Sequence, residues 1–380
     1  MDSTLHTKWK ECGVPDVHTL KNKHVIVRVD WNMPIIDGVI TDTSRFDVTV
    51  PFLKELSVAG AKIIILTHFG EKGESLQVIA THVMRALPFI SFIPTLVFED
   101  IQKSISKCKE GDGILLENVR MWKGETENIP SLARSFASLG DVFINDAFSV
   151  SHREHASVVG IPKSLLSYFG PTFMRELEHL QNALHPEKPA LMIIGGAKIA
   201  TKLRLIEKYL NLGVQVFVGG AMVHTIWKAR GIEIGKSLYD ETQNLSETFI
   251  HHPLLLTPSD VILSNGNRVL YHAIPKDGVV VDCGSETTEA LATIIHNAKT
   301  VIFNGPLGLY EKGWLHGSEH ILTTLAHTED ITSYIGGGDT VSIAHSLHLL
   351  KKFTFVSLGG GAMLDFLASG TLPGIDAVTK

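Results

Sequence analysis

Short apolar runs that end at a glycine or a polar residue constrain the fold of this chain most strongly. In the first half, β-branched runs of this kind lie at 24–30, 61–68, 113–118 and 141–146, and segments with helical spacing separate them. Continuous apolar runs of this length are typical of parallel strands that are buried on both faces. The alternation of strands and helices therefore predicts a doubly wound parallel-sheet domain of the α/β class.

The same rhythm restarts after residue 187, where six apolar runs each end at glycine: ALMIIGG, VQVFVGG, GVVVDCG, KTVIFNG, TSYIGGG and FTFVSLGGG. In open parallel sheets ligands bind at the carboxyl ends of the strands, where glycine allows the backbone to approach a phosphate or nucleotide. A tight turn would explain any single glycine, but the set of six favours a nucleotide site. We expect these runs to form a second parallel, Rossmann-like sheet.

The length of the chain and one helical segment indicate how the two sheets are divided. A chain of 380 residues suggests two domains, because most domains contain about 100–200 residues. Residues 171–186 have apolar side chains at helical intervals and end at a proline, as expected of an interdomain helix. The expected boundaries are therefore 1–170 for the N-terminal domain and 187–356 for the C-terminal domain.

Charge and composition exclude several classes of partner. The formal charge is -6, which disfavours a nucleic-acid or anionic membrane surface as the main partner. The three cysteines have no CxxC spacing, and the N-terminus lacks the apolar core of a signal peptide. We therefore expect a cytoplasmic enzyme that acts on small molecules, and a monomer because no heptad seam is present.

Polar side chains follow the strands of the first half and should meet at one edge of the sheet. They are Asp30, Asn32, His68, Asn118, Arg120 and Asp146, to which Arg45, His152, Arg153 and His155 can be added. Several cations and imidazoles form a natural receptor for a small polyanion, such as a phosphorylated carboxylate. A surface ion pair remains the alternative for any one arginine.

Two segments of the second half carry candidates for phosphate and metal binding. Lys198 and Lys202 lie four residues apart, and we expect them on one face of the first turn of a helix, where phosphate is attracted. The segment 336–340 adds Asp339, a carboxylate that Mg²⁺ would accept beside a nucleotide, and Thr340. Solvated lysines and a helix cap at Asp339 are the simpler alternatives.

Taken together, these segments resemble the phosphoglycerate kinase family along nearly the whole chain. The motifs occur in the order of the family: VRVDWNMP, ITDTSR, LTHFG, LLENVRMWKGE, INDAFSVSHREHAS, IIGGAKIATK, VGGAM, GIEIGKSL, FNGPLGLYE, IGGGDT and SLGGGAMLDFLASGTLPG. The resemblance implies an N-terminal domain for 3-phosphoglycerate and a C-terminal domain for Mg²⁺ with ATP or ADP. It also implies hinge closure and a final segment, 357–380, that returns to the N-terminal domain.

The resemblance also implies a role for each matching residue. The phosphoglycerate would be held by Asp30, Asn32, Arg45, His68, Arg120 and Arg153. The nucleotide would be bound by Lys198, Lys202, Gly219, Gly220, Asn304, Pro306, Glu311, Gly337, Gly338, Asp339 and Thr340, with Asp339 also on the metal. The catalytic set would be Arg45, Lys198, Gly337 and Gly360. Since a carboxylate acceptor needs no general base, we expect reversible, direct in-line phosphoryl transfer between 1,3-bisphosphoglycerate with ADP and 3-phosphoglycerate with ATP, in glycolysis and gluconeogenesis.

One departure from the family falls in the expected acid site. Glu71 stands where the family usually has arginine, and Lys72 follows as a residue that could compensate for the reversed charge. Milder departures are Trp31, Ser149, Thr201 and Leu358. Two alternatives to the kinase follow: a divergent family member that only binds nucleotide, and a kinase that acts on another small acid.

Overall fold

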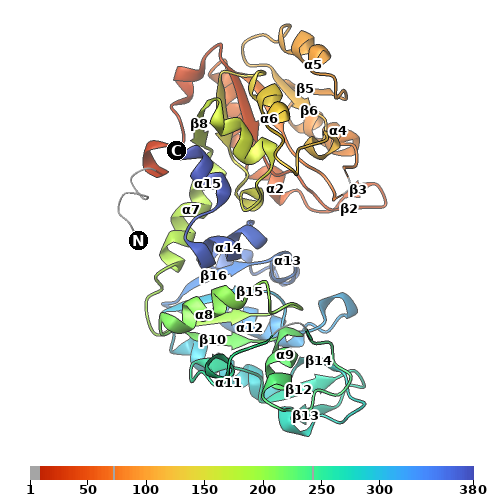
Figure 1. The fold of residues 1–380 in the computed structure, drawn as a ribbon, viewed down its shortest axis with the longest axis vertical. Coiled ribbons are helices and arrows are strands. Elements are labelled where there is room, and N and C mark those ends of the chain that lie inside the picture. Colours follow the sequence, from red (N-terminus) through yellow and green to blue (C-terminus); the bar gives the residue numbers. More distant parts are fainter. Residues whose placement is uncertain (1–8, 72, 242–243) are drawn as a thin grey trace. The chain divides into compact units, whose positions relative to one another are not determined.

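The computed structural model describes residues 9–71, 73–241 and 244–380. The chain forms two compact units, of which unit 1 is Met1–Glu178 with Thr371–Lys380 and unit 2 is His179–Gly370 (Figure 1). The first boundary falls inside helix α7 (Pro171–Ala183). The second falls between α14 (Gly361–Ser369) and α15 (Pro373–Val378), because α14 contacts α8 (Leu203–Asn211) of unit 2. Residues 357–370 therefore lie in unit 2, whereas the expected returning segment began at 357.

Unit 1 is built on one parallel sheet of six strands in the order β5-β6-β4-β1-β7-β8. The four strands expected from the sequence are β1 (His24–Arg28), β4 (Lys62–Leu66), β6 (Gly113–Leu116) and β7 (Val142–Asn145). The edge strands β5 (Ile90–Ile93) and β8 (Leu166–Phe169) were not expected, since both contain exposed or partly exposed side chains instead of a continuous buried run. The doubly wound fold class is confirmed.

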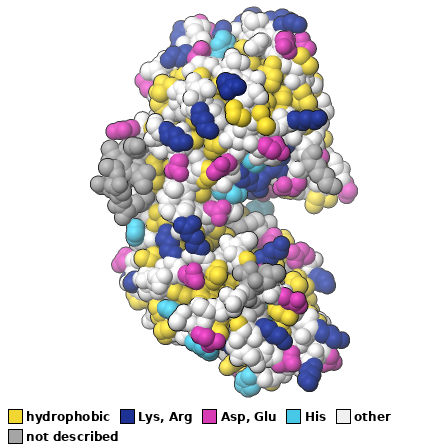
Figure 2. Space-filling view, viewed as in Figure 1, with side chains coloured by type: hydrophobic (Ala, Val, Ile, Leu, Met, Phe, Trp, Pro, Cys, Tyr) yellow, Lys and Arg dark blue, Asp and Glu magenta, His cyan; other side chains and the backbone are white. Residues whose placement is uncertain are grey.

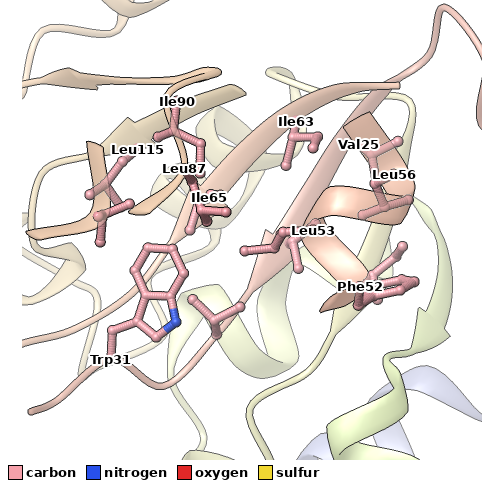
Figure 3. Close-up of a cluster of buried hydrophobic side chains, with 14 of the residues drawn as sticks. Val25, Trp31, Phe52, Leu53, Leu56, Ile63, Ile65, Leu87, Ile90 and Leu115 are labelled. Carbon is pink, nitrogen blue, oxygen red and sulfur yellow. The ribbon is translucent and has the colours of Figure 1, made fainter. Parts of the chain in front are cut away.

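Helices cover both faces of this sheet and complete its core. They are α2 (Ser44–Asp47), α3 (Val50–Val58), α4 (Gln77–Ala86), α5 (Phe98–Ile105) and α6 (Pro130–Ala137), with 3₁₀ or π turns at Val17–Leu20, Val119–Met121, Phe148–Val150, Ala156–Gly160 and Ile161–Lys163, and a hairpin of β2 (Ile35–Ile36) and β3 (Val39–Ile40). Figure 3 shows the α3 face, where Leu53 and Leu56 lie in one buried cluster with Val25 of β1 and with Ile63 and Ile65 of β4. The segment after β3 forms two helices, α2 and α3, because a proline in the first turn of α3 cannot continue the hydrogen bonds of α2.

Unit 2 is built on a second parallel sheet, in the order β11-β10-β9-β15-β16-β17. Its strands are β11 (Leu255–Leu256), β10 (Gln215–Val218), β9 (Ala190–Ile194), β15 (Thr300–Asn304), β16 (Thr332–Gly336) and β17 (Phe355–Val356). The helices are α8, α9 (Met222–Ala229), α10 (Glu247–Ile250), α11 (Ser285–His296), α12 (His316–His327), α13 (Gly338–Ser346) and α14, with 3₁₀ turns at Tyr271–Ala273, Tyr310–Lys312 and Leu350–Lys352. Five of the six glycine-ended runs lie in this sheet.

The sixth run, GVVVDCG, was wrongly expected to be a strand of the parallel sheet. It forms β14 (Val280–Cys283) in a separate antiparallel sheet with β12 (Asp260–Leu263) and β13 (Arg268–Leu270). Helix α12 contacts β14 and buries this strand, so its apolar run resembles that of a parallel strand. The following Gly284 serves packing, because a Cβ there would lie 2.0 Å from the Asp260 carboxylate.

Candidate functional site

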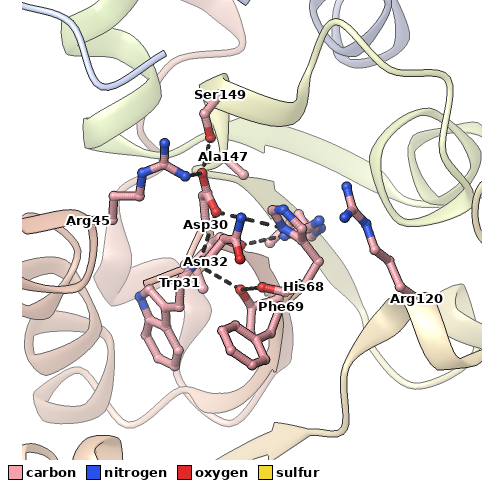
Figure 4. A network of polar contacts seen from close by, with 12 residues as sticks. Asp30, Trp31, Asn32, Arg45, His68, Phe69, Arg120, Ala147 and Ser149 are labelled. Carbon is pink, nitrogen blue, oxygen red and sulfur yellow. Dashed lines mark hydrogen bonds and ion pairs between the residues drawn. The ribbon is translucent and has the colours of Figure 1, made fainter. Parts of the chain in front are cut away.

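A network of charged side chains around Asp30 lies at the carboxyl end of the unit 1 sheet (Figure 4). Asp30 follows β1, and its Oδ2 accepts a hydrogen bond from Arg45 Nη1 of α2 at 2.6 Å. The same oxygen accepts from the Ser149 hydroxyl, and Oδ1 accepts from the Asn32 backbone N–H at 3.1 Å. Asp30 is therefore a buried anchor that fixes the direction of Arg45.

His68, which follows β4, lies against the same carboxylate. Its Nδ1 is 3.7 Å from Asp30 Oδ1, and its side chain is buried. Burial and the nearby guanidinium groups lower the pKa of His68, although Asp30 acts in the opposite direction. Burial alone would raise the pKa of Asp30, but Arg45, His68 and the hydrogen bonds lower it. At neutral pH the pair is an anionic Asp30 beside a neutral imidazole.

Asn32 and Arg120 hold the loop that follows His68. Asn32 Oδ1 accepts from the Gly70 N–H at 3.0 Å, while Arg120 Nη1 donates to the Gly70 carbonyl oxygen. Arg120 Nη1 also lies 3.2 Å from Glu71 Oε2, so the acidic residue at the departure from the family pairs with an expected substrate ligand. Lys72, which could compensate for that charge, lies outside the described residues.

The last segment of the expected site contains the histidines and Arg153. Arg153 Nε lies within hydrogen-bond distance of His152 Nε2, at 3.3 Å. His155 Nδ1 is 3.9 Å from Glu125 Oε1, and burial with nearby arginines lowers the pKa of His155 to about 4. His155 therefore faces a buried carboxylate and is neutral at physiological pH.

A buried network of Arg28, Ser157 and Glu125 was missed in the sequence. Arg28 Nε donates to Ser157 Oγ at 3.0 Å, and the Ser157 hydroxyl donates to Glu125 Oε1. Burial lowers the pKa of Arg28 and raises that of Glu125, while each group opposes the shift in the other. A charged residue inside the apolar run 24–30 was the signal that could have revealed Arg28.

Two residues expected at this edge have structural contacts instead. Asn118 Nδ2 donates to the carbonyl oxygens of Phe69 at 2.6 Å and Glu74 at 2.7 Å, so it shapes the 69–74 loop. Asp146 Oδ1 accepts from the Phe173 N–H at 3.0 Å in the first turn of α7. Both side chains support the loops and helices around the site.

Unit 2 contains a cavity of about 350 Å³ at the carboxyl ends of its strands. Four residues expected at the nucleotide line it: Gly220, Pro306, Glu311 and Asp339. The wall also contains apolar residues that the sequence did not single out, among them Val223, Leu238, Val261, Val281 and Leu307. A concave, largely apolar pocket with a few polar groups at one side is suited to a nucleoside phosphate.

The two lysines occupy the loop before α8, and the expectation that they share the first turn of a helix was wrong. The chain turns through Gly196 at φ +114°, and α8 begins only at Leu203. Lys202 Nζ donates to the Gly195 carbonyl oxygen at 2.6 Å. Burial lowers the pKa of Lys202 to about 8, with Asp339 acting in the opposite direction. Lys198 is exposed instead.

The N-terminus of α13 brings the remaining polar candidates together. Thr340 Oγ1 accepts from the Gly305 N–H at 2.9 Å and so ties α13 to the end of β15, where Asn304 is buried. The N-cap is Gly337 at φ +90°, so the alternative in which Asp339 caps this helix is wrong. Partial burial and Glu311 raise the pKa of Asp339, while Lys202 lowers it.

The other expected glycines differ in how closely they are packed. A Cβ at Gly219 would lie 2.7 Å from Leu307, and one at Gly220 would lie 2.7 Å from the backbone of Gly196. By contrast, Gly338 in the first turn of α13 and Gly360 at the N-cap of α14 have open space where a Cβ would be. Both positions therefore leave backbone N–H groups accessible at helix N-termini.

Two α/β units, one with a cluster of arginines and histidines around Asp30 and the other with a cavity lined partly by glycines, are the features expected of a phosphotransferase. Comparison with known proteins agrees: the sequence model of the family described as phosphoglycerate kinase matches residues 14–370. The chain belongs to the phosphoglycerate kinase family, and its activity is the family's glycolytic phosphoryl transfer, with a nucleotide as one substrate.

Individual relatives cover nearly the whole chain. The phosphoglycerate kinase of Fervidobacterium nodosum is 35% identical over 384 residues, which cover 94% of this chain and 96% of that protein. That of Wolbachia sp. subsp. Drosophila simulans is 37% identical over 394 residues, with 97% and 99% covered. The structure of phosphoglycerate kinase from Coxiella burnetii has a TM-score of 0.80 and 32% identity, covering 95% of this chain and 97% of that one.

None of the helices in the described residues is both long and apolar enough to span a bilayer. Within residues 9–71, 73–241 and 244–380, no group of three or more His, Cys, Asp or Glu side chains is placed so that it could hold a metal ion.

Proposed function

We propose that unit 1 binds 3-phosphoglycerate and that unit 2 binds the magnesium complex of ATP or ADP. The observation that carries the first assignment is the cluster at the carboxyl end of the unit 1 sheet, where Asp30 orients Arg45 and a neutral His68 lies beside it. With Asn32, Arg120 and Arg153 this cluster supplies the donors that a phosphate and a carboxylate require. The alternative of a kinase that acts on another small acid is distinguished by turnover with a panel of such acids.

The nucleotide would lie in the unit 2 cavity, with its base against the apolar wall and its phosphates toward Lys198 and Lys202. Glu311 lines the same cavity and would bind the ribose. Gly219, Gly220, Asn304 and Pro306 would shape the base end, while Gly337, Gly338 and Thr340 would contribute the N-terminus of α13 at the phosphates. The buried Lys202 keeps its charge close to the cavity, because it donates to Gly195 beside it.

Asp339 is the residue that fits a magnesium ion. It lines the cavity as an exposed carboxylate. Because no three metal-binding side chains converge in the described residues, the ion would be held by Asp339 together with nucleotide oxygens. When bound, it would neutralise charge on the phosphates.

For the transfer itself we propose an in-line attack by the acid's carboxylate on the γ-phosphoryl group. That carboxylate is ionised near neutral pH, so the chain needs to supply alignment and positive charge and no general base. Arg45 and Lys198 would supply the charge, with the N-termini at Gly337 and Gly360. Lys198 is exposed and its side chain has no partner in the described part of the chain, so it is available to the phosphoryl group. We propose that the two units close about the segment that joins them, and that this closure brings the two substrates together.

We infer a monomer in the cytoplasm that has neither a nucleic-acid nor a membrane partner. Acidic and basic side chains are interspersed on the face shown in Figure 2, and the net charge is -6. A surface of mixed sign favours small-molecule substrates over polyanionic partners.

The test is turnover of purified protein with MgATP and 3-phosphoglycerate, alongside a panel of other small phosphorylated and carboxylated acids. We expect Lys198→Ala to lower kcat by about a hundredfold, because it removes charge from the transferring group. Lys299→Ala is the matched control, since Lys299 is exposed at the opposite end of β15 and should leave kcat unchanged. MgATP binding without turnover of any acid would favour the family member that only binds nucleotide.

A further inference from the structure

Glu71 and Arg120 form an ion pair inside the proposed acid site. Arg120 Nη1 lies 3.2 Å from Glu71 Oε2, and it also donates to the carbonyl oxygen of Gly70. The Arg120 side chain is 5% exposed, whereas that of Glu71 is 79% exposed. A buried guanidinium is thus held from the protein side and covered by a carboxylate from the solvent side.

We propose that Glu71 is an internal anion that occupies Arg120 until the acid substrate displaces it, and that it thereby sets the affinity and charge selectivity of the acid site. This inference rests on the proposed function of unit 1. Glu71 acts on the substrate through Arg120 and through its own charge, so it is a positioning residue.

The second arginine–carboxylate pair of the site shows why Glu71 can be displaced. Asp30 is 8% exposed and accepts hydrogen bonds from Arg45, Ser149 and the Asn32 backbone, so it is part of the fixed framework. Glu71, by contrast, forms an ion pair with Arg120. Among the described residues it has no set of hydrogen-bond donors comparable to the three that hold Asp30. The Glu71 carboxylate is 79% exposed and keeps most of its contact with water, so the pair holds it weakly and an incoming phosphate or carboxylate can replace it at low cost.

Displacement does not remove the negative charge from the site. Glu71 directly follows Gly70, whose carbonyl oxygen accepts a hydrogen bond from Arg120. The Glu71 carboxylate therefore stays close to an anion that is bound at Arg120. Like charges at this range repel, and the repulsion grows with the charge of the ligand. The site should therefore bind acids more weakly than its arginines alone would, and it should disfavour more highly charged anions.

The test compares Glu71→Gln with Glu74→Gln in the full-length protein. Gln keeps the size of the side chain and removes its charge. Glu74 is an exposed acid of the same loop that makes no ion pair within the described residues, so it controls for loss of one negative charge nearby. The readouts are the dissociation constant of 3-phosphoglycerate by calorimetry, the KM for each substrate, and both at low and high NaCl.

We expect Glu71→Gln to tighten 3-phosphoglycerate binding by about three- to thirtyfold and to lower its KM similarly, with the KM for MgATP unchanged. The advantage over wild type should shrink as NaCl screens the repulsion, a response that a purely structural role would not show. Equal affinities in wild type and Glu71→Gln, or an equal gain in Glu74→Gln, would overturn the inference. Failure of both proteins to bind 3-phosphoglycerate would instead overturn the proposed function, and the inference with it.

Discussion

Lys202 Nζ lies 2.6 Å from the Gly195 carbonyl oxygen, within the loop that joins β9 to α8. This hydrogen bond turns the lysine back across the loop toward the end of β9, and Asp339 is the opposite charge that acts on it. The ammonium group is thereby kept beside the unit 2 cavity, in a partly buried position.

The first prediction follows from the pKa of Lys202, which burial lowers to about 8. Only the charged form attracts nucleotide phosphates, so the KM for MgATP should rise as pH increases from 7 to 9, by up to about tenfold per unit above the pKa. Lys202→Arg should flatten this rise, because a guanidinium stays charged throughout the range. Steady-state kinetics at a series of pH values measures the KM for MgATP in both proteins. An equally steep rise of this KM in the arginine variant would contradict the prediction.

Gly220 provides a prediction about stability. It has φ +62°, and a Cβ there would lie 2.7 Å from the backbone N and O of Gly196. Gly220→Ala should therefore destabilise unit 2 by about 2–4 kcal/mol, from left-handed strain plus the clash, and should weaken nucleotide binding. Gly231→Ala is the control, since φ is +75° there and no atom lies within 4 Å. Urea unfolding should show a loss of only about 1 kcal/mol for the control.

Asp146 gives a prediction for the pH dependence of stability. Burial raises its pKa from 3.8 to about 7, although hydrogen bonds from Phe173 and Thr172 act in the opposite direction. Between these two values the folded state holds a proton that the unfolded state releases, so stability falls as pH rises through the window and stays low above it.

Asp146→Asn removes this titration and keeps an oxygen for the Phe173 N–H. The free energy of unfolding of the variant, relative to that of wild type, should therefore increase by about 2–3 kcal/mol from pH 5 to pH 8. Urea unfolding at both pH values measures the difference. A constant gap between the two proteins would show that the carboxyl group does not titrate in this range.

Trp31, one of the milder departures from the family pattern, makes a hydrogen bond that can be tested. Its Nε1 donates to Thr49 Oγ1 at 3.0 Å, and the indole is fully buried. Thr49→Val should cost about 1–3 kcal/mol, because the buried N–H loses its partner. The loss in the double variant Thr49→Val with Trp31→Phe should be smaller than the sum of the two single losses, and strict additivity would contradict the prediction.

Much of the fold could be read from the sequence because buried parallel strands have a strong local signature. The runs at 24–30 and 190–196 became β1 and β9, and the polar residues after β1 and β4 met at one edge as expected. The run of GVVVDCG was assigned to the wrong sheet, since burial by a helix gives an antiparallel strand the same apolar pattern. Local periodicity reports burial and is silent about the partner strand.

The sequence by itself determined the fold class, the family and the identity of the charged groups, because these depend on residue types and their order along the chain. Only the tertiary structure decided which groups touch. It paired Arg120 with Glu71, placed Arg28 and Glu125 on either side of Ser157, and turned Lys202 back to Gly195. The physical reason is that ion pairs and pKa values depend on distance and burial between segments far apart in sequence, which no local pattern of residues records.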